Sequence, residues 1–196
     1  MDKIKVYESS VIMEDYADKI YDTLELTNLT LKAAGNGIIP KAIPDDCIPS
    51  IQENIKLLDS YTDNLRTKIL EIKSAVDRND EIQKDIGLCF EYVSAMKFFI
   101  DTTKYFVFLY VDRKYEDTLD YTIKMQIRKY LGEYAKSAYD IVSHIRNIKF
   151  SDYCYIERGL ISYDQSKAKR RKNEFKNPFL YDKPFNAWEE CDDNDE

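Results

Sequence analysis

The sequence has few of the residues that interrupt helices, with five glycines and five prolines in 196 residues. Three of the prolines and two of the glycines fall within residues 35–49, which leaves long segments without either. Charged residues make up 33% of the chain and hydrophobic residues 44%. Scarce turn formers and abundant charge favour a few long amphipathic helices. The length suits one domain with a sizeable core.

Histidine and closely spaced cysteine, the usual zinc ligands, are equally scarce, because there is one histidine and the four cysteines are far apart. A structural zinc site needs closely spaced thiolates or imidazoles, so we expect no metal and no cofactor. A disulfide framework is not expected at this cysteine density. We therefore expect reduced thiols and an intracellular, cytoplasmic setting. The cysteines are Cys47, Cys89, Cys154 and Cys191.

Long apolar runs are also missing. The longest uninterrupted run is Tyr105–Val111, and seven residues are too few to cross a bilayer. The N-terminus leads into charged sequence without the apolar stretch of a signal peptide. The sequence therefore predicts no membrane span.

A first periodic segment begins near Ser9 or Ser10, either of which could cap a helix. A stripe of mostly apolar residues then recurs at alternating intervals of four and three, which places it on one helix face. Gly35 lies just beyond the stripe and predicts a helix stop. The stripe consists of Met13, Ala17, Ile20, Leu24, Thr27, Leu31 and Ala34.

A second periodic segment begins after Pro49, where Ser50 and Glu53 match the S-x-x-E capping box. Its core positions follow a heptad pattern with one polar member, Thr62. This period favours a coiled-coil-like hairpin over residues 10–86, joined by the proline-rich loop. The heptad seam consists of Ile51, Ile55, Leu58, Thr62, Leu65, Ile69, Ile72 and Val76.

A third segment runs from about residue 88 to residue 111, and Gly87 predicts a break before it. Two adjacent stripes are apolar, which is typical of a central helix with neighbours on two sides. The aromatic and β-branched run 105–111 also fits a strand, but no partner strand is visible, so we expect a helix. The stripes are Leu88, Tyr92, Ala95, Phe99, Phe106 and Tyr110, and Cys89, Val93, Met96, Ile100 and Val107.

A fourth segment follows a turn at 112–115 and runs to about residue 149, with Gly132 as a weak point. Its inner face consists of Leu119, Ile123, Ile127, Tyr130, Tyr134, Ala138, Ile141, Ile145 and Ile148.

The predicted fold is therefore an all-α four-helix bundle spanning residues 1–163. It combines the hairpin 10–86 with a second helix pair, 88–149, and residues 151–163 leave room for a fifth short helix. Periodicity fades beyond that point, so we expect residues 164–196 to form an extended, flexible tail that is first basic and then acidic.

The lone histidine lies beside an arginine late in the fourth segment, in Ser143-His144-Ile145-Arg146-Asn147. This pair resembles the R-x4–6-H motif of the HEPN superfamily of helical RNases. In such a motif an arginine can hold a phosphate while a histidine moves a proton. Here the order is reversed, and no histidine follows Arg146 at the family spacing. The resemblance makes His144 and Arg146 weak catalytic candidates, and the alternative is an ordinary surface histidine beside an arginine.

The tail carries three short patterns. The basic run 167–172 could bind nucleic acid or an anionic membrane surface, or act as a nuclear import signal. Asn177-Pro178-Phe179 resembles the NPF tripeptide bound by EH domains, and Trp188 with its acidic neighbours resembles the tryptophan-acidic motif recognised by kinesin light chains. An alternative is that the tail aromatics dock on the bundle or on a second copy. The basic side chains are Lys167, Lys169, Arg170, Arg171 and Lys172.

The net charge of −7 is concentrated at the C-terminus, where residues 174–196 hold eight acidic and two basic side chains. Nucleic acid is therefore not the favoured partner. Because no catalytic constellation is found, we expect a non-enzymatic helical interaction module, acting as an assembly factor, adaptor or inhibitor. It would bind another protein through its helix faces or its tail, and could self-associate through the heptad faces. The alternatives are a HEPN-like RNase or its inactive relative, and nucleic-acid binding through residues 167–172.

Overall fold

The computed structural model describes residues 3–33, 45–76, 82–112 and 117–149. These residues form four α-helices, and a short 3-10 helix, η1, precedes the second. No strand occurs in the described ranges, so the predicted all-α four-helix bundle is confirmed. The elements are α1 (Lys3–Ala33), η1 (Asp45–Cys47), α2 (Ile48–Ala75), α3 (Gln83–Asp112) and α4 (Asp117–Lys149).

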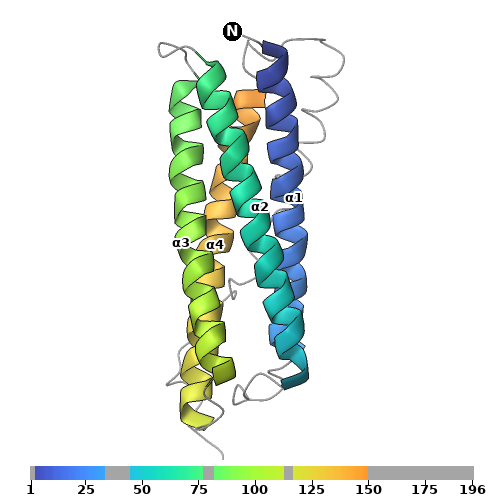
Figure 1. Cartoon of the computed structure of the whole chain (residues 1–196), viewed down its shortest axis with the longest axis vertical. Helices are drawn as coiled ribbons and strands as arrows, with labels where there is room; N and C mark the ends of the chain where they lie inside the picture. The colour runs from blue at the N-terminus through green and yellow to red at the C-terminus, as the bar shows by residue number, and fades with distance from the viewer. Residues whose placement is uncertain (1–2, 34–44, 77–81, 113–116, 150–196) are drawn as a thin grey trace, which may run out of the picture.

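Consecutive helices run in opposite directions along one long axis (Figure 1). Each helix packs against two neighbours, because α1 contacts α2 and α4, and α3 contacts α2 and α4. The four helices therefore surround one core, and each keeps an outer face that points away from it.

The heptad positions of the first two helices form part of this core. Every predicted seam residue of α1 from Met13 to Leu31 is buried, and so is every seam residue of α2. The polar seam residues make hydrogen bonds within their own helices, Thr27 to the carbonyl of Thr23 and Thr62 to the carbonyl of Leu58. Since these faces pack inside the bundle, contact with a second copy has to use another surface.

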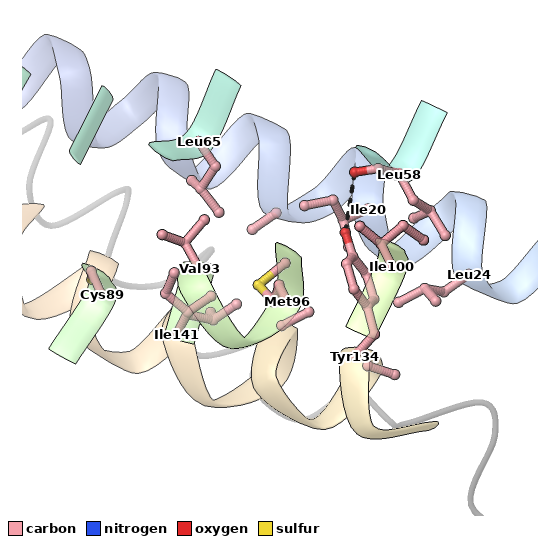
Figure 2. Close-up of a cluster of buried hydrophobic side chains, with 14 of the residues drawn as sticks. Ile20, Leu24, Leu58, Leu65, Cys89, Val93, Met96, Ile100, Tyr134 and Ile141 are labelled. Atoms are coloured by element: carbon pink, nitrogen blue, oxygen red, sulfur yellow. Dashed lines mark hydrogen bonds between the residues drawn. The ribbon is translucent and has the colours of Figure 1, made fainter. Parts of the chain in front are cut away.

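The α3 helix has the broad apolar face that its two stripes predict. The stripe that contains Val93, Met96 and Ile100 is fully buried, and most of the other stripe is half-buried. Figure 2 shows these three side chains beside Tyr134 and Ile141 of α4, facing the side chains of α1 and α2. The alternative of a strand over residues 105–111 is wrong, because this run continues α3.

The first helix begins earlier than its sequence pattern indicates. The α1 helix already includes Lys3, and Val6 is buried two turns before the predicted stripe. Ser9 and Ser10 are buried within the helix and do not cap it. The hydroxyl of Ser10 donates to the carbonyl of Tyr7 at 2.7 Å, a bond that keeps this small polar side chain satisfied inside the bundle.

The predicted capping box at Ser50 and Glu53 is wrong. The α2 helix begins at Ile48, its N-cap residue is Cys47, and no side-chain hydrogen bond caps it. Pro49 stands in the first turn, where a residue without an N–H costs no helical hydrogen bond. The proline therefore lies inside the start of the helix and not in the loop before it.

The predicted break at Gly87 is also wrong, because α3 begins at Gln83 and continues through this glycine. Ile86 and Cys89 on either side of it are buried, so packing of the helix outweighs the low helix propensity of glycine here.

None of the helices in the described ranges is long and apolar enough to cross a membrane. The predicted fifth helix at 151–163, the tail 164–196 and most of the loop 35–49 lie outside the described residues.

Candidate binding surface

Three aromatic side chains are exposed on the outer face of α3. Phe98 is 61% exposed, Tyr105 is 57% exposed and Phe108 is 62% exposed. With Asp101, they follow one another at intervals of three and four residues, so they share one helix face. The buried stripe occupies the opposite side of α3, which leaves these rings no place in the core. Phe98, Asp101, Tyr105 and Phe108 are called the aromatic stripe below.

A groove between α2 and α3 adjoins the C-terminal end of the aromatic stripe. Its volume is about 250 Å³, and Phe108 forms part of its wall. Val107 and Val111 of α3 and Ile55 of α2 supply the rest of its apolar lining. The polar members of its wall are Gln52, Lys56 and Lys104. The groove therefore extends the apolar surface from α3 towards α2.

A network of ion pairs borders the stripe on the side that faces α2. Asp59 of α2 accepts hydrogen bonds from Lys97, at 2.6 Å, and from Lys104 of α3. Asp101 lies 3.3 Å from the Lys104 ammonium, and Asp63 lies 3.3 Å from that of Lys97. These pairs fix α3 against α2, so the wall of the groove and the base of the stripe are held in one arrangement.

The two ends of this network influence each other's protonation. Burial alone would raise the pKa of Asp59, but hydrogen bonds from Lys104 and Lys97 bring that pKa below its ordinary value. Burial alone would lower the pKa of Lys97, and its hydrogen bonds to Asp59 and Asp63 raise that pKa above the usual value. Asp59 and Lys97 therefore stay charged at neutral pH.

Sequence reasoning missed the aromatic stripe, although a signal for it was present. The two apolar stripes predicted for α3 account for its buried face, yet they leave Phe98, Tyr105 and Phe108 unassigned. A helix with more large aromatic residues than its inner face can hold must expose the remainder. The surplus of aromatic residues in the second half of α3 was therefore the available signal.

The weak catalytic candidate His144 faces α3. Its Nδ1 atom lies 2.6 Å from a carboxylate oxygen of Asp85, and the amide of Asn147 donates to the same oxygen at 3.0 Å. Because a carboxylate only accepts, Nδ1 carries the proton in this contact. The imidazole also stacks on Tyr92, with ring centroids 5.7 Å apart. His144 is thus a half-buried residue that joins α4 to α3.

Arg146 faces α1 instead. Its Nε atom lies 3.6 Å from a carboxylate oxygen of Glu14, and Lys149 donates to the other oxygen at 2.8 Å. All three side chains are largely shielded from solvent. The structure therefore separates the two candidates, because His144 and Arg146 engage different neighbouring helices and do not converge on one site.

The described ranges contain one fully buried cysteine and no cluster of metal-ligating side chains. Cys89 is buried, and burial raises the pKa of its thiol well above the usual range, so the thiol is protonated at neutral pH. No group of three or more His, Cys, Asp or Glu side chains in these ranges could hold a metal ion.

The binding residues predicted in the tail lie outside the described residues. They are Lys167, Lys169, Arg170, Arg171, Lys172, Asn177, Pro178, Phe179 and Trp188.

Comparison of the chain with models of known families, with curated proteins and with solved structures finds no match.

Proposed function

We propose that the chain is a non-catalytic helical protein–protein interaction module, an assembly factor, adaptor or inhibitor that binds through the aromatic stripe and the adjoining groove. The observation that carries this proposal is the set of three aromatic rings, each more than half exposed, on one face of α3. Exposed aromatic residues are enriched in protein interfaces, where their burial contributes much of the binding energy.

The size of the apolar surface supports the same proposal. An aromatic side chain offers about 150–250 Å² of surface, so three rings at this exposure present roughly 350 Å². The largest apolar patch on a typical monomer covers about 300–600 Å² and is often functional, so the exposed rings are large enough to mark an interaction site. The groove adds further apolar surface beside Phe108.

The arrangement of polar side chains supports a non-catalytic role. His144 is held by Asp85 and Arg146 lies against Glu14, so neither shares a site with the other. A HEPN-like RNase would need both groups at one phosphate. We therefore place this alternative second, together with nucleic-acid binding through residues 167–172.

The location that we propose is intracellular and cytoplasmic. Cys47 and Cys89 are free thiols, which suits a reducing compartment.

Site-specific photo-crosslinking tests the proposal. A benzoyl-phenylalanine at position 105, introduced in the cell that makes this chain, should form covalent adducts with a protein partner. Tyr139 of α4 is also exposed, at 40%, and the same probe there is the matched control. Mass spectrometry of the adduct identifies the partner, which is then purified for direct binding measurements.

The expected result has two parts. Adducts form at position 105 well above those at position 139, and the purified partner loses affinity for the Tyr105→Glu variant but not for the Tyr139→Glu variant. Equal yields at the two positions would overturn the proposed function, as would a partner whose affinity is unchanged by Tyr105→Glu.

A further inference from the structure

The aromatic stripe has a spacing that reads the same in both directions along α3. Phe98, Asp101, Tyr105 and Phe108 are separated by three, four and three residues. The midpoint of the stripe falls level with Thr103, which is itself buried on the opposite face. A stripe with this symmetry can pack against an identical stripe that runs antiparallel to it. Each residue of one copy then lies level with the residue of the other copy that is equally far from the midpoint on its other side.

We infer that the partner of this surface is a second copy of the chain, joined by antiparallel packing of α3 against α3 about a two-fold axis level with Thr103. This inference rests on the proposed function and names its partner. A two-fold interface uses the same patch on both copies, so the patch must be complementary to itself. The spacing of the aromatic stripe meets that requirement.

The residues brought together by the two-fold axis match chemically. Phe98 lies level with Phe108 of the other copy, which pairs two rings that are each about 60% exposed. Asp101 lies level with Tyr105 of the other copy, where the phenol can donate a hydrogen bond to the carboxylate. Symmetry repeats both contacts, so the stripe alone supplies two pairs of phenylalanine rings and two polar contacts that fix the register.

The groove lies beside the stripe, on the side of α3 that faces α2. Phe108 forms part of its wall, together with Val111 and Ile55, and its volume is about 250 Å³. Because Phe98 of the other copy lies level with Phe108, its ring packs against the stripe at the level of this wall, once on each copy.

Two lysines lie beside the exposed carboxylate of Asp101 at this interface. Its side chain is 51% exposed and lies 3.3 Å from the Lys104 ammonium and 3.9 Å from that of Lys97. Both lysines also contact Asp59, on the side of α3 that faces α2. Asp101 therefore lies beside two cations, which reduces the repulsion between the two copies of this carboxylate.

The area of the surface predicts a reversible dimer. Two stripes of roughly 350 Å² each bury about 700 Å², and the groove walls and flanking side chains add to this. Stable complexes bury about 1,200–2,000 Å² in total, so the two stripes alone fall below that range and predict a weak, transient interface. We therefore expect monomer and dimer to exchange, in proportions that depend on protein concentration.

Sedimentation of the purified full chain measures the exchange, and a pair of charge variants tests the register. Tyr105→Glu places a negative charge level with Asp101 of the other copy, and Tyr105→Lys places a positive charge there. Both variants lose the ring, so the difference between them reports the contact with Asp101. We expect Tyr105→Glu to weaken dimerisation about a hundredfold relative to Tyr105→Lys, because two symmetric contacts each change sign. Tyr139→Glu is the control and should sediment like the unaltered chain.

Crosslinking between labelled copies tests the orientation. Benzoyl-phenylalanine at position 98 in unlabelled protein is mixed with isotope-labelled chain, so that adducts between copies are distinguished from adducts within one copy. We expect adducts at Phe108, Val111 or Ile55 of the labelled copy. Adducts at Phe98 of the labelled copy would indicate parallel pairing and overturn the inference.

Three further outcomes would overturn it. They are a strict monomer at all concentrations, equal effects of Tyr105→Glu and Tyr105→Lys, and adducts of position 98 only with residues 150–196 of its own chain. If the purified chain is a strict monomer but position 105 captures a different, verified protein in the cell, the inference fails and the proposed function stands. If position 105 captures no protein in the cell and the purified chain is a strict monomer, both fail.

Discussion

The hydroxyl oxygens of Thr62 and Tyr134 lie 2.8 Å apart at the centre of the bundle, where they join α2 to α4. The carbonyl of Leu58 completes this small polar group, since Thr62 lies 2.7 Å from it and Tyr134 lies 3.3 Å from it. Both side chains are fully buried. The one polar residue of the heptad seam thus meets a tyrosine whose ring is apolar and whose tip is polar, which satisfies both groups without water.

We expect Tyr134→Phe to lower the free energy of unfolding by about 1 kcal/mol, because it removes a buried hydrogen bond but leaves Thr62 bonded to Leu58. Urea denaturation measures the change. Tyr139→Phe, at a side chain that is 40% exposed, is the control and should change the free energy by a few tenths at most. Combining Tyr134→Phe with Thr62→Val should show coupling between the two sites. Strict additivity of the two changes would contradict this assignment.

The heptad seams could be predicted from the sequence because their signal is long and repeated. Residues such as Leu58, Leu65 and Ile72 recur over many turns, so the loss of one position to a polar residue does not hide the pattern. The helix ends depend on single residues and were less predictable. Ser50 matches a capping motif, yet the helix starts before it because Pro49 suits a first turn.

The candidate site could not be predicted because exposure is a property of the whole packing arrangement. Phe98 and Phe99 are neighbours in sequence and identical in type, yet only Phe99 packs against the core. Which of the two faces outward is decided by where α2 and α4 lie around α3. Similarly, His144 and Arg146 are two residues apart in sequence, but helical geometry directs them to different helices.

Gly87, where the sequence predicts a break but the structure has a continuous helix, offers a stabilising substitution. This glycine is exposed within α3, and a Cβ atom built on it would have no heavy atom within 4 Å. Gly87→Ala should therefore raise the free energy of unfolding by about 1 kcal/mol, because alanine loses less backbone entropy in a helix. Thermal and urea unfolding, with helix content from circular dichroism, measure the gain. A loss of stability of similar size would mean that the chain needs the flexibility of glycine at this position, as the predicted break had implied.

A fourth helix that carries both His144 and Arg146 calls for a direct test of RNA cleavage. We expect no cleavage of single-stranded RNA by the purified chain, because the imidazole is held by Asp85 on α3 while the guanidinium lies against Glu14 on α1. His144→Ala should instead lower stability by about 1 kcal/mol, through loss of the Asp85 contact and the Tyr92 stack. Cleavage that this variant abolishes, with the fold retained, would establish the HEPN-like alternative.

Lys124 of α4 is a fully buried cation, with no exposed surface. Burial, together with the nearby charge of Arg128, lowers its pKa to about 8. Arg128 is held in place by donating to the carbonyl of Leu31 at 2.7 Å. The unfolded chain would bind a proton at this lysine up to its ordinary pKa of 10.5.

The sign of the pH dependence follows from these two pKa values. Between about pH 8 and 10.5 the unfolded state holds a proton at Lys124 that the folded state has released, so raising the pH across this range favours the folded state. We therefore expect the unaltered chain to gain stability over this range relative to Lys124→Met, which has nothing to titrate there. Denaturation of both proteins at a series of pH values measures the difference in their free energies of unfolding. Taking this difference cancels the contributions of the titrating groups that both proteins share. Lys129→Met, at an exposed lysine of the same helix, is the matched control for replacing a lysine with methionine. The difference in free energy of unfolding between the unaltered chain and Lys124→Met could instead stay constant with pH. That result would show that Lys124 keeps its ordinary pKa, and hence that water reaches its ammonium group in the folded protein.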